Sequence, residues 1–225
     1  MKIKFYAHAS FRIEGDGLAV VTDPYTPGSQ ASHFDPIDEP ADIVIRSSPD
    51  DRFHNDPSHI MGNPVVVDAL HIGPEGTSVK GLHIRAFPTA ESKTFDFGRP
   101  AMDNAMYTFT IEGIRMFHMG DVGNPLSDEH LAALRSSVDV MFALTGGHAT
   151  IALDDLDVAI KGIRPSIVIP MHYHSDRGVL NILPVKAFTD RYPKESVIWA
   201  GGSEMIVTRD TLPTTMQIHV LQQCR

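Results

Sequence analysis

Short apolar runs separated by glycine, proline and polar residues dominate the first two thirds of the chain. Runs of four to eight residues rich in β-branched and aromatic side chains, bounded by turn-forming residues, are typical of β-strands. The runs that predict strands are Lys2–Tyr6, Leu18–Thr22, Ile43–Arg46, Val65–Val67, Leu82–Ala86, Tyr107–Ile111, Ile114–His118 and Val138–Leu144. This part of the chain is therefore predicted to be rich in strands.

From Ser127 onward the pattern changes to helical spacing. Ser127 is a candidate N-cap, acidic residues follow it in the first turn, and Leu131 with Leu134 supplies an apolar face. A second helix is predicted over Ala152–Ile163, where apolar residues recur on one stripe and a glycine and a proline mark the end. A buried strand, Ser166–Pro170, follows.

Composition narrows the classes of protein. The 225 residues suffice for a single domain, and the formal net charge of -9 disfavours nucleic acid as a partner, because phosphate binding depends on Lys and Arg. Cys224 is the only cysteine, so no disulfide within the chain and no cysteine-based zinc site is expected. With no run of about 18 apolar residues, we expect a soluble, cytoplasmic protein without a membrane partner. A homo-oligomer stays open.

Three predicted strands end in residues that carry chemistry. Asp121, His148 and His172 each follow an apolar strand and lie next to glycine or proline. Polar groups at the carboxyl ends of strands in layered α/β folds commonly line a site, and carboxylate with imidazole suits zinc or manganese. The alternatives are a turn aspartate for Asp121 and locally hydrogen-bonded histidines, and for His148 a simple tight turn is equally plausible.

Several segments resemble the metallo-β-lactamase superfamily, in the branch that contains ascorbate-6-phosphate lactonase-like hydrolases. KIKFYAHASFRIEGDGLAVVTDPY resembles the first hairpin, with His8 before a small residue and Asp23 ending a strand. FHMGDVG, LTGGHATIALDDLDVAI and IPMHYH resemble the segments that supply Asp121, His148 and His172. The resemblance implies a four-layer αββα sandwich, a single domain over the whole chain, and a metal site at one edge of the sandwich.

The chain departs from this family after the strand that ends at Arg46. The family carries His-x-His-x-Asp-His there, whereas this chain reads SSPDDRFHND. Alignment from the strand places Ser48 at the first histidine and Asp50 at the second. With one inserted residue, His54 falls near the last histidine, and Arg52 or Asp51 falls where the aspartate belongs. An acidic, solvated loop is the equally weighted alternative.

A second family histidine is missing after Leu82–Ala86, where Glu91 is the nearest equivalent. The expected metal ligands are therefore Asp50, His54, Glu91, Asp121 and His172. This set suits one divalent ion per chain, zinc or manganese, since carboxylates favour harder ions while the general affinity order favours zinc. A two-zinc site is not expected.

The leading hypothesis is a metal-dependent hydrolase of a small ester, lactone or phosphorylated sugar-type substrate. Asp121 would hold the ion, Asp51 would orient or deprotonate the water, and His8 with His148 would contact the substrate. The alternative is a catalytically silent relative that keeps the fold and binds a ligand or partner in the altered pocket. Whether the chain is an enzyme is thus open from the sequence.

Overall fold

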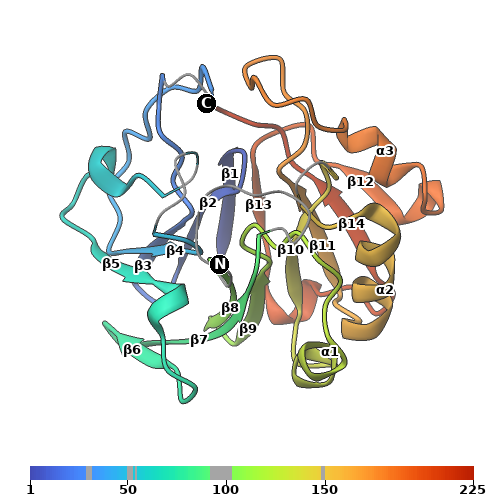
Figure 1. The fold of residues 1–225 in the computed structure, drawn as a ribbon, viewed down its shortest axis with the longest axis horizontal. Helices are drawn as coiled ribbons and strands as arrows, with labels where there is room; N and C mark the ends of the chain where they lie inside the picture. The colour runs from blue at the N-terminus through green and yellow to red at the C-terminus, as the bar shows by residue number, and fades with distance from the viewer. Residues whose placement is uncertain (29–31, 50–52, 54, 92–102, 148–149) are drawn as a thin grey trace.

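The computed structural model describes residues 1–28, 32–49, 53, 55–91, 103–147 and 150–225, and its framework is two β-sheets that pack against each other (Figure 1). The first sheet has six strands in the order β13-β1-β2-β3-β4-β5. Their bounds are β13 Glu204–Ile206, β1 Lys2–Ala7, β2 Ser10–Gly15, β3 Leu18–Thr22, β4 Ile43–Arg46 and β5 Val65–Asp68. The strands β3, β4 and β5 run parallel, so their carboxyl ends share one edge.

The second sheet has eight strands in the order β12-β14-β11-β10-β9-β8-β7-β6. Their bounds are β12 Val197–Trp199, β14 Gln217–Val220, β11 Ile167–Met171, β10 Val140–Leu144, β9 Ile114–His118, β8 Asn104–Ile111, β7 Leu82–Thr89 and β6 Thr77–Val79. The central strands β9, β10 and β11 are parallel neighbours, which brings the loops after them together at the sheet edge.

The α-helices lie on the outer side of the eight-stranded sheet (Figure 1). They are α1 Asp128–Leu134, α2 Leu153–Ile163 and α3 Val185–Thr189, with short 3₁₀ helices at Pro57–His59, Ala69–His71, Lys194–Ser196 and Arg209–Thr211. Two packed sheets with outer helices confirm the predicted α/β class of the metallo-β-lactamase type. Among the described residues, no helix is long and apolar enough to cross a membrane.

Aromatic side chains join the two sheets in the core. The ring of Phe11 on β2 lies 4.6 Å from that of Phe5 on β1 and 4.5 Å from that of Phe142 on β10. All three side chains are fully buried. Stacked rings of this kind contribute packing energy beyond their buried area, so this triple fixes the separation of the sheets near the site.

Most of the predicted elements are present. The strands Leu18–Thr22, Ile43–Arg46 and Ile114–His118 have the predicted bounds, and the helix after Ser127 has that residue as N-cap, accepting from the backbone N–H of His130. The prediction missed β2, whose RIEG segment is interrupted by charges, the short strand β6, and everything after β11, where the strands are only three or four residues long.

A buried aspartate anchors the start of β10. Asp139 is 4% exposed, and its carboxylate accepts hydrogen bonds from the guanidinium of Arg115 at 2.6 and 2.9 Å. It also accepts the backbone N–H of Arg115 at 2.8 Å and the guanidinium of Arg209 at 2.9 Å. Burial acts to raise the pKa of Asp139, but the hydrogen bonds from Arg115 outweigh it, so the pKa lies below its ordinary value.

Asp139→Asn should lower the free energy of unfolding at pH 7 by about 2 kcal/mol, less than for a wholly buried pair because both arginines are half exposed. Because the pKa of Asp139 is lower in the folded than in the unfolded state, its carboxylate stabilises the fold fully above the unfolded-state pKa of about 3.9. This stabilisation is lost as the pH falls through the folded-state pKa. Urea unfolding of both proteins between pH 3 and 7 measures this. The exposed pair variant Asp190→Asn is the control, with an expected change below about 0.5 kcal/mol.

Candidate metal centre

Asp121 and His172 meet at the carboxyl edge of the second sheet. Asp121 follows β9 and His172 directly follows β11, and Oδ1 of Asp121 lies 3.5 Å from Nε2 of His172. Both side chains are buried. The two residues are about fifty positions apart in the sequence, so the convergence expected from their place at strand ends is present.

His8 brings the first sheet into this site. Its ring lies 4.1 Å from the ring of His172, and its carbonyl oxygen accepts the backbone N–H of His172 at 2.8 Å. His8 directly follows β1, so this hydrogen bond joins the end of a strand in one sheet to the end of a strand in the other. Asp121, His172 and His8 therefore form one cluster, and we call it the edge cluster.

The backbone around the edge cluster is left-handed at several non-glycine residues. The φ angles are 58° at His8, 35° at Asp23 and 50° at His172, each just after a strand. For residues with a Cβ this conformation costs about 1–2 kcal/mol each. Such outliers persist where surrounding structure enforces them, and they gather at functional sites. This concentration is an indication of function that is independent of side-chain type.

Two glycines permit close approach at the same edge. A Cβ on Gly146 would lie 2.2 Å from the carbonyl oxygen of His172. A Cβ on Gly120, where φ is 59°, would lie 2.7 Å from Oδ1 of Asn104 and 2.8 Å from Cβ of Ser47. Gly120 of FHMGDVG and Gly146 of LTGGH are thus required by close packing beside Asp121 and His172.

Buried polar residues hold the loops that carry the edge cluster. Oδ1 of Asn104 accepts the backbone N–H of Asp121 at 3.0 Å, and Oδ1 of Asp23 accepts the backbone N–H of Ser47 at 2.6 Å. The second bond fixes the start of the loop in which the family motif is altered. Ser48 follows in that loop and is 1% exposed, so the residue aligned with the first family histidine is buried.

His118 is a structural residue below the edge cluster. Its Nδ1 accepts the backbone N–H of Gly120 at 3.0 Å, which assigns the proton to Nε2, 3.0 Å from the carbonyl oxygen of Ala9. Its ring stacks on Tyr107 at 4.9 Å, and Nδ1 lies 3.3 Å from Oδ2 of Asp23. His118 was not singled out among the histidines, and the signal that could have found it is its place at the end of the apolar run Ile114–His118.

Of the remaining predicted site residues, only Glu91 lies among the residues that the structure describes. Glu91 is 6% exposed, and its backbone N–H donates to Oδ1 of Asp103 at 2.9 Å. The preceding carbonyl accepts the N–H of Gly123 at 3.2 Å, so Glu91 adjoins the loop that contains Asp121. The other predicted residues lie outside the described residues: Asp50, Asp51, His54 and His148. The roles of Glu91, Asp50 and His54 as ligands, of Asp51 in catalysis and of His148 in substrate binding stay predictions.

The geometry of the edge cluster can be tested against a metal ion. The 3.5 Å separation of Oδ1 and Nε2 would let both atoms bind one ion at the bond length of about 2.1 Å that zinc takes with such ligands. Across the described ranges, no group of three or more His, Cys, Asp or Glu residues comes together as a metal site. Asp121 and His172 therefore fit as two ligands, and further ligands would have to come from elsewhere.

Gly146→Ala should lower the free energy of unfolding by about 1–3 kcal/mol, because the methyl group must displace the carbonyl of His172. Gly202→Ala is the matched control: its Cβ would meet nothing within 4 Å, and its backbone is not left-handed, so no loss is expected. Thermal unfolding of both variants compares them. Equal stability of the two would contradict the close packing at Gly146.

Comparison with known proteins supports this description. Residues 2–172 match the model of the beta-lactamase superfamily domain. A UPF0173 metal-dependent hydrolase of Geobacillus sp. strain WCH70 is 26% identical over 207 residues, which cover 78% of this chain and 86% of that protein. The UPF0173 metal-dependent hydrolase YtkL of Bacillus subtilis strain 168 is 26% identical over 226 residues, covering 86% and 93%.

Among solved structures, the chain is similar to a Thermotoga maritima protein assigned to the Zn-dependent hydrolases of the metallo-beta-lactamase superfamily. That similarity has 26% identity and a TM-score of 0.77 over 99% of both chains. The narrower lactonase-like branch stays a prediction. Because the family model covers well over half of the sequence and the fold agrees, this chain belongs to the beta-lactamase superfamily.

Proposed function

We propose that this protein is a metal-dependent hydrolase that acts on a small ester or lactone. The observation that carries the proposal is the buried pair of Asp121 and His172, whose oxygen and nitrogen lie 3.5 Å apart beside His8. The relatives of similar length are named metal-dependent hydrolases, and the similar Thermotoga maritima structure is assigned to Zn-dependent hydrolases. These names support the same class of activity here.

Asp121 and His172 would hold the ion. A bound divalent ion lowers the pKa of a water molecule and polarises the carbonyl of an ester. In the balanced reaction, the oxygen of water bonds to the acyl carbon, the acyl–oxygen bond breaks, and one proton of water passes to the leaving alcohol. The backbone at His172 is held by the bond from its amide N–H to the carbonyl of His8, and the backbone at Asp121 by the bond from its amide N–H to Oδ1 of Asn104.

The remaining roles follow from the sequence and are part of the proposal. Asp50, His54 and Glu91 would complete the shell of the ion, and Asp51 would orient or deprotonate the water. His148 and His8 would contact the substrate. His8 has the strongest support of these, since its ring packs against that of His172.

We propose one ion per chain, either zinc or manganese. The imidazoles of His172 and His54 suit zinc, while the carboxylates of the proposed set suit harder ions such as manganese. A second ion is not favoured, because a buried serine, Ser48, aligns with the first family histidine and hydroxyls are poor zinc ligands.

The second candidate is a catalytically silent binding protein. The observation that favours it is the small number of convergent ligands: within the part of the chain that the structure describes, no group of three or more His, Cys, Asp or Glu residues comes together as a metal site. Metal content separates the two candidates. Less than about one tenth of an ion per chain, even after addition of zinc or manganese, would favour the silent protein.

His172→Asn should lower the affinity for the metal ion, and so the bound metal. The loss should exceed the roughly 10- to 100-fold in affinity that follows from removing a residue that only orients a ligand. Asparagine tolerates the left-handed backbone, so the change removes the imidazole with little added strain. The matched control is His174→Asn, two residues away and exposed, which should keep wild-type metal content. Elemental mass spectrometry on the purified proteins, with Asp121→Asn as a second ligand variant, measures this. Equal metal in all of them would contradict the site.

A further inference from the structure

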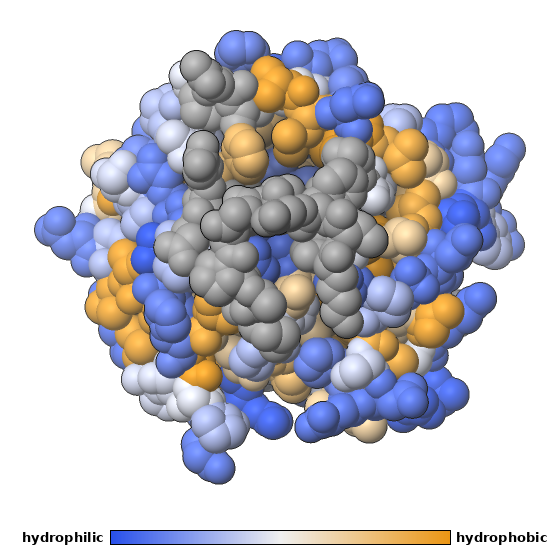
Figure 2. Space-filling view, viewed as in Figure 1, coloured by the Kyte–Doolittle hydropathy of each residue, from blue (hydrophilic) through white to orange (hydrophobic). Residues whose placement is uncertain are grey.

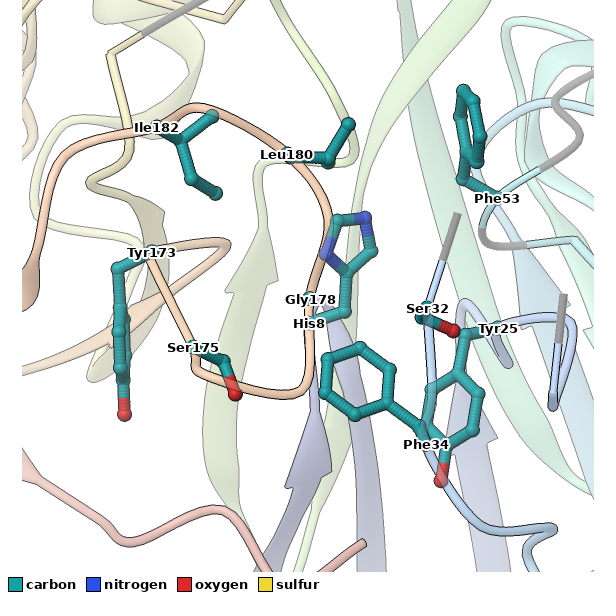
Figure 3. A pocket seen from close by; sticks show the side chains of 10 residues that line it. All are labelled: His8, Tyr25, Ser32, Phe34, Phe53, Tyr173, Ser175, Gly178, Leu180 and Ile182. Atoms are coloured by element: carbon teal, nitrogen blue, oxygen red, sulfur yellow. The ribbon is translucent and has the colours of Figure 1, made fainter. Parts of the chain in front are cut away.

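A small apolar pocket opens beside the edge cluster. Six of the residues that line it are aromatic or aliphatic: Tyr25, Phe34, Phe53, Tyr173, Leu180 and Ile182 (Figure 3). They come from the loops after β3, β4 and β11, at the edge where the carboxyl ends of these strands lie. In the space-filling view, apolar residues gather in the upper part of the face that Figure 2 shows.

His8 is a wall shared by this pocket and the edge cluster. Its imidazole lines the pocket, between Leu180 and Phe34 in Figure 3, and its ring is 4.1 Å from that of His172. A group bound in the pocket therefore lies one imidazole away from the proposed hydrolytic centre. This is the position of a substrate side group rather than of the bond that is cleaved.

The two tyrosines present ring surface to the pocket. The hydroxyl of Tyr25 donates to the carbonyl of Asp35 at 2.7 Å, and that of Tyr173 donates to the carbonyl of Leu221 at 3.1 Å. Burial raises the pKa of Tyr173 to about 12 and that of Tyr25 further, so both stay neutral at any ordinary pH. With their hydroxyls engaged elsewhere, these residues act as apolar walls.

The loops that form the pocket are fastened to each other. Ser32 and Gly178 form a β-bridge, and the N–H of His33 donates to the carbonyl of Arg177 at 2.8 Å. The guanidinium of Arg177 binds Asp35 at 2.9 Å and the carbonyl of His33 at 2.6 Å. Arg177 thus joins the two loops through two of its guanidinium N–H donors.

The described lining residues include no lysine and no arginine. A phosphate group placed among them would lose its hydration without gaining a cation or a fork of N–H donors, which is unfavourable. An apolar group would instead exchange water for aromatic and aliphatic contacts. The chemistry of these walls thus favours an uncharged, apolar part of a substrate over a phosphorylated sugar.

We infer that this pocket binds the apolar acyl chain of an uncharged ester or lactone and so selects the substrate. The inference rests on the proposed function for the reaction itself. It adds that selection resides in the pocket between the loops after β3 and β11, with Leu180 as a specificity-determining residue opposite Phe34.

The test compares 4-nitrophenyl acetate with 4-nitrophenyl hexanoate on the metal-loaded protein. Each buried methylene contributes about fourfold, so kcat/KM should be at least about tenfold higher for the hexanoate. Leu180→Asp should reduce this hexanoate-to-acetate ratio to near one, because a carboxylate at the pocket disfavours the chain. Val179→Asp is the matched control: Val179 is 50% exposed and does not line the pocket, so the same charge one residue away should leave the ratio unchanged.

A second measurement tests binding in the pocket independently of ester hydrolysis. Saturation-transfer NMR with 1-hexanol reports binding without turnover, and the signal should be present in wild type and Val179→Asp and lost in Leu180→Asp. Ester hydrolysis with equal rates for acetate and hexanoate would overturn the pocket and leave the hydrolase. Binding of 1-hexanol that Leu180→Asp abolishes, without any ester hydrolysis, would support the pocket and overturn ester hydrolysis. Absence of both would overturn both.

Discussion

The structure depends on the hydrogen bonds that join its two sheets at one edge. The aromatic core would let the sheets slide, since apolar contacts have little directionality. Hydrogen bonds at the edge remove that freedom: Nε2 of His118 in the second sheet reaches the carbonyl of Ala9 in the first, and the N–H of His172 reaches the carbonyl of His8. These bonds are directional and buried. Breaking one without a replacement therefore costs more free energy of unfolding than the intact bond contributes on balance.

This fastening accounts for the unusual backbone at the site. To place its carbonyl against His172, the chain at His8 must turn sharply out of β1, and the left-handed φ of 58° accomplishes the turn. Asp23 has a similar left-handed turn after β3, and its carboxylate accepts the N–H of Ser47 after β4, the neighbouring strand of the same sheet. The strain at His8 is local and is compensated by a bond that exists only when both sheets are docked. The residues that bring the sheets together are thus the residues that shape the site.

Sequence patterns predicted the part of this structure that depends on local periodicity and capping. The strand Ile114–His118 and the cap at Ser127 were found because each leaves a local signal of apolar runs or of N-cap chemistry. The three-residue strand Glu204–Ile206 leaves no such signal, because pairing with a distant strand decides its conformation.

The candidate site was predictable to a similar degree and for a similar reason. Asp121 and His172 stood out because strand ends at a common edge converge, and the structure places them together. The supporting roles of Asn104 and His118 were not found, since their partners lie 17 and 109 positions away in the chain. Positions in the altered loop, such as Asp50 and His54, depended on an alignment through an inserted residue and stay predictions.

The residues that hold the edge cluster are largely distinct from the loop in which the family motif is altered. Gly120, Gly146, Asp23 and His118 fix the backbone around Asp121 and His172, and among the contacts of the described residues the altered loop takes part through its start at Ser47. Substitutions beyond Ser47 leave the bonds from His118 to Ala9 and from His172 to His8 with both partners. On such a framework, metal ligands and substrate contacts can change while the fold persists, which is why fold alone does not decide activity. The pocket beside His8 draws on both parts of the molecule, because Phe53 belongs to the altered loop whereas Phe34 and Leu180 belong to loops that are joined through Arg177.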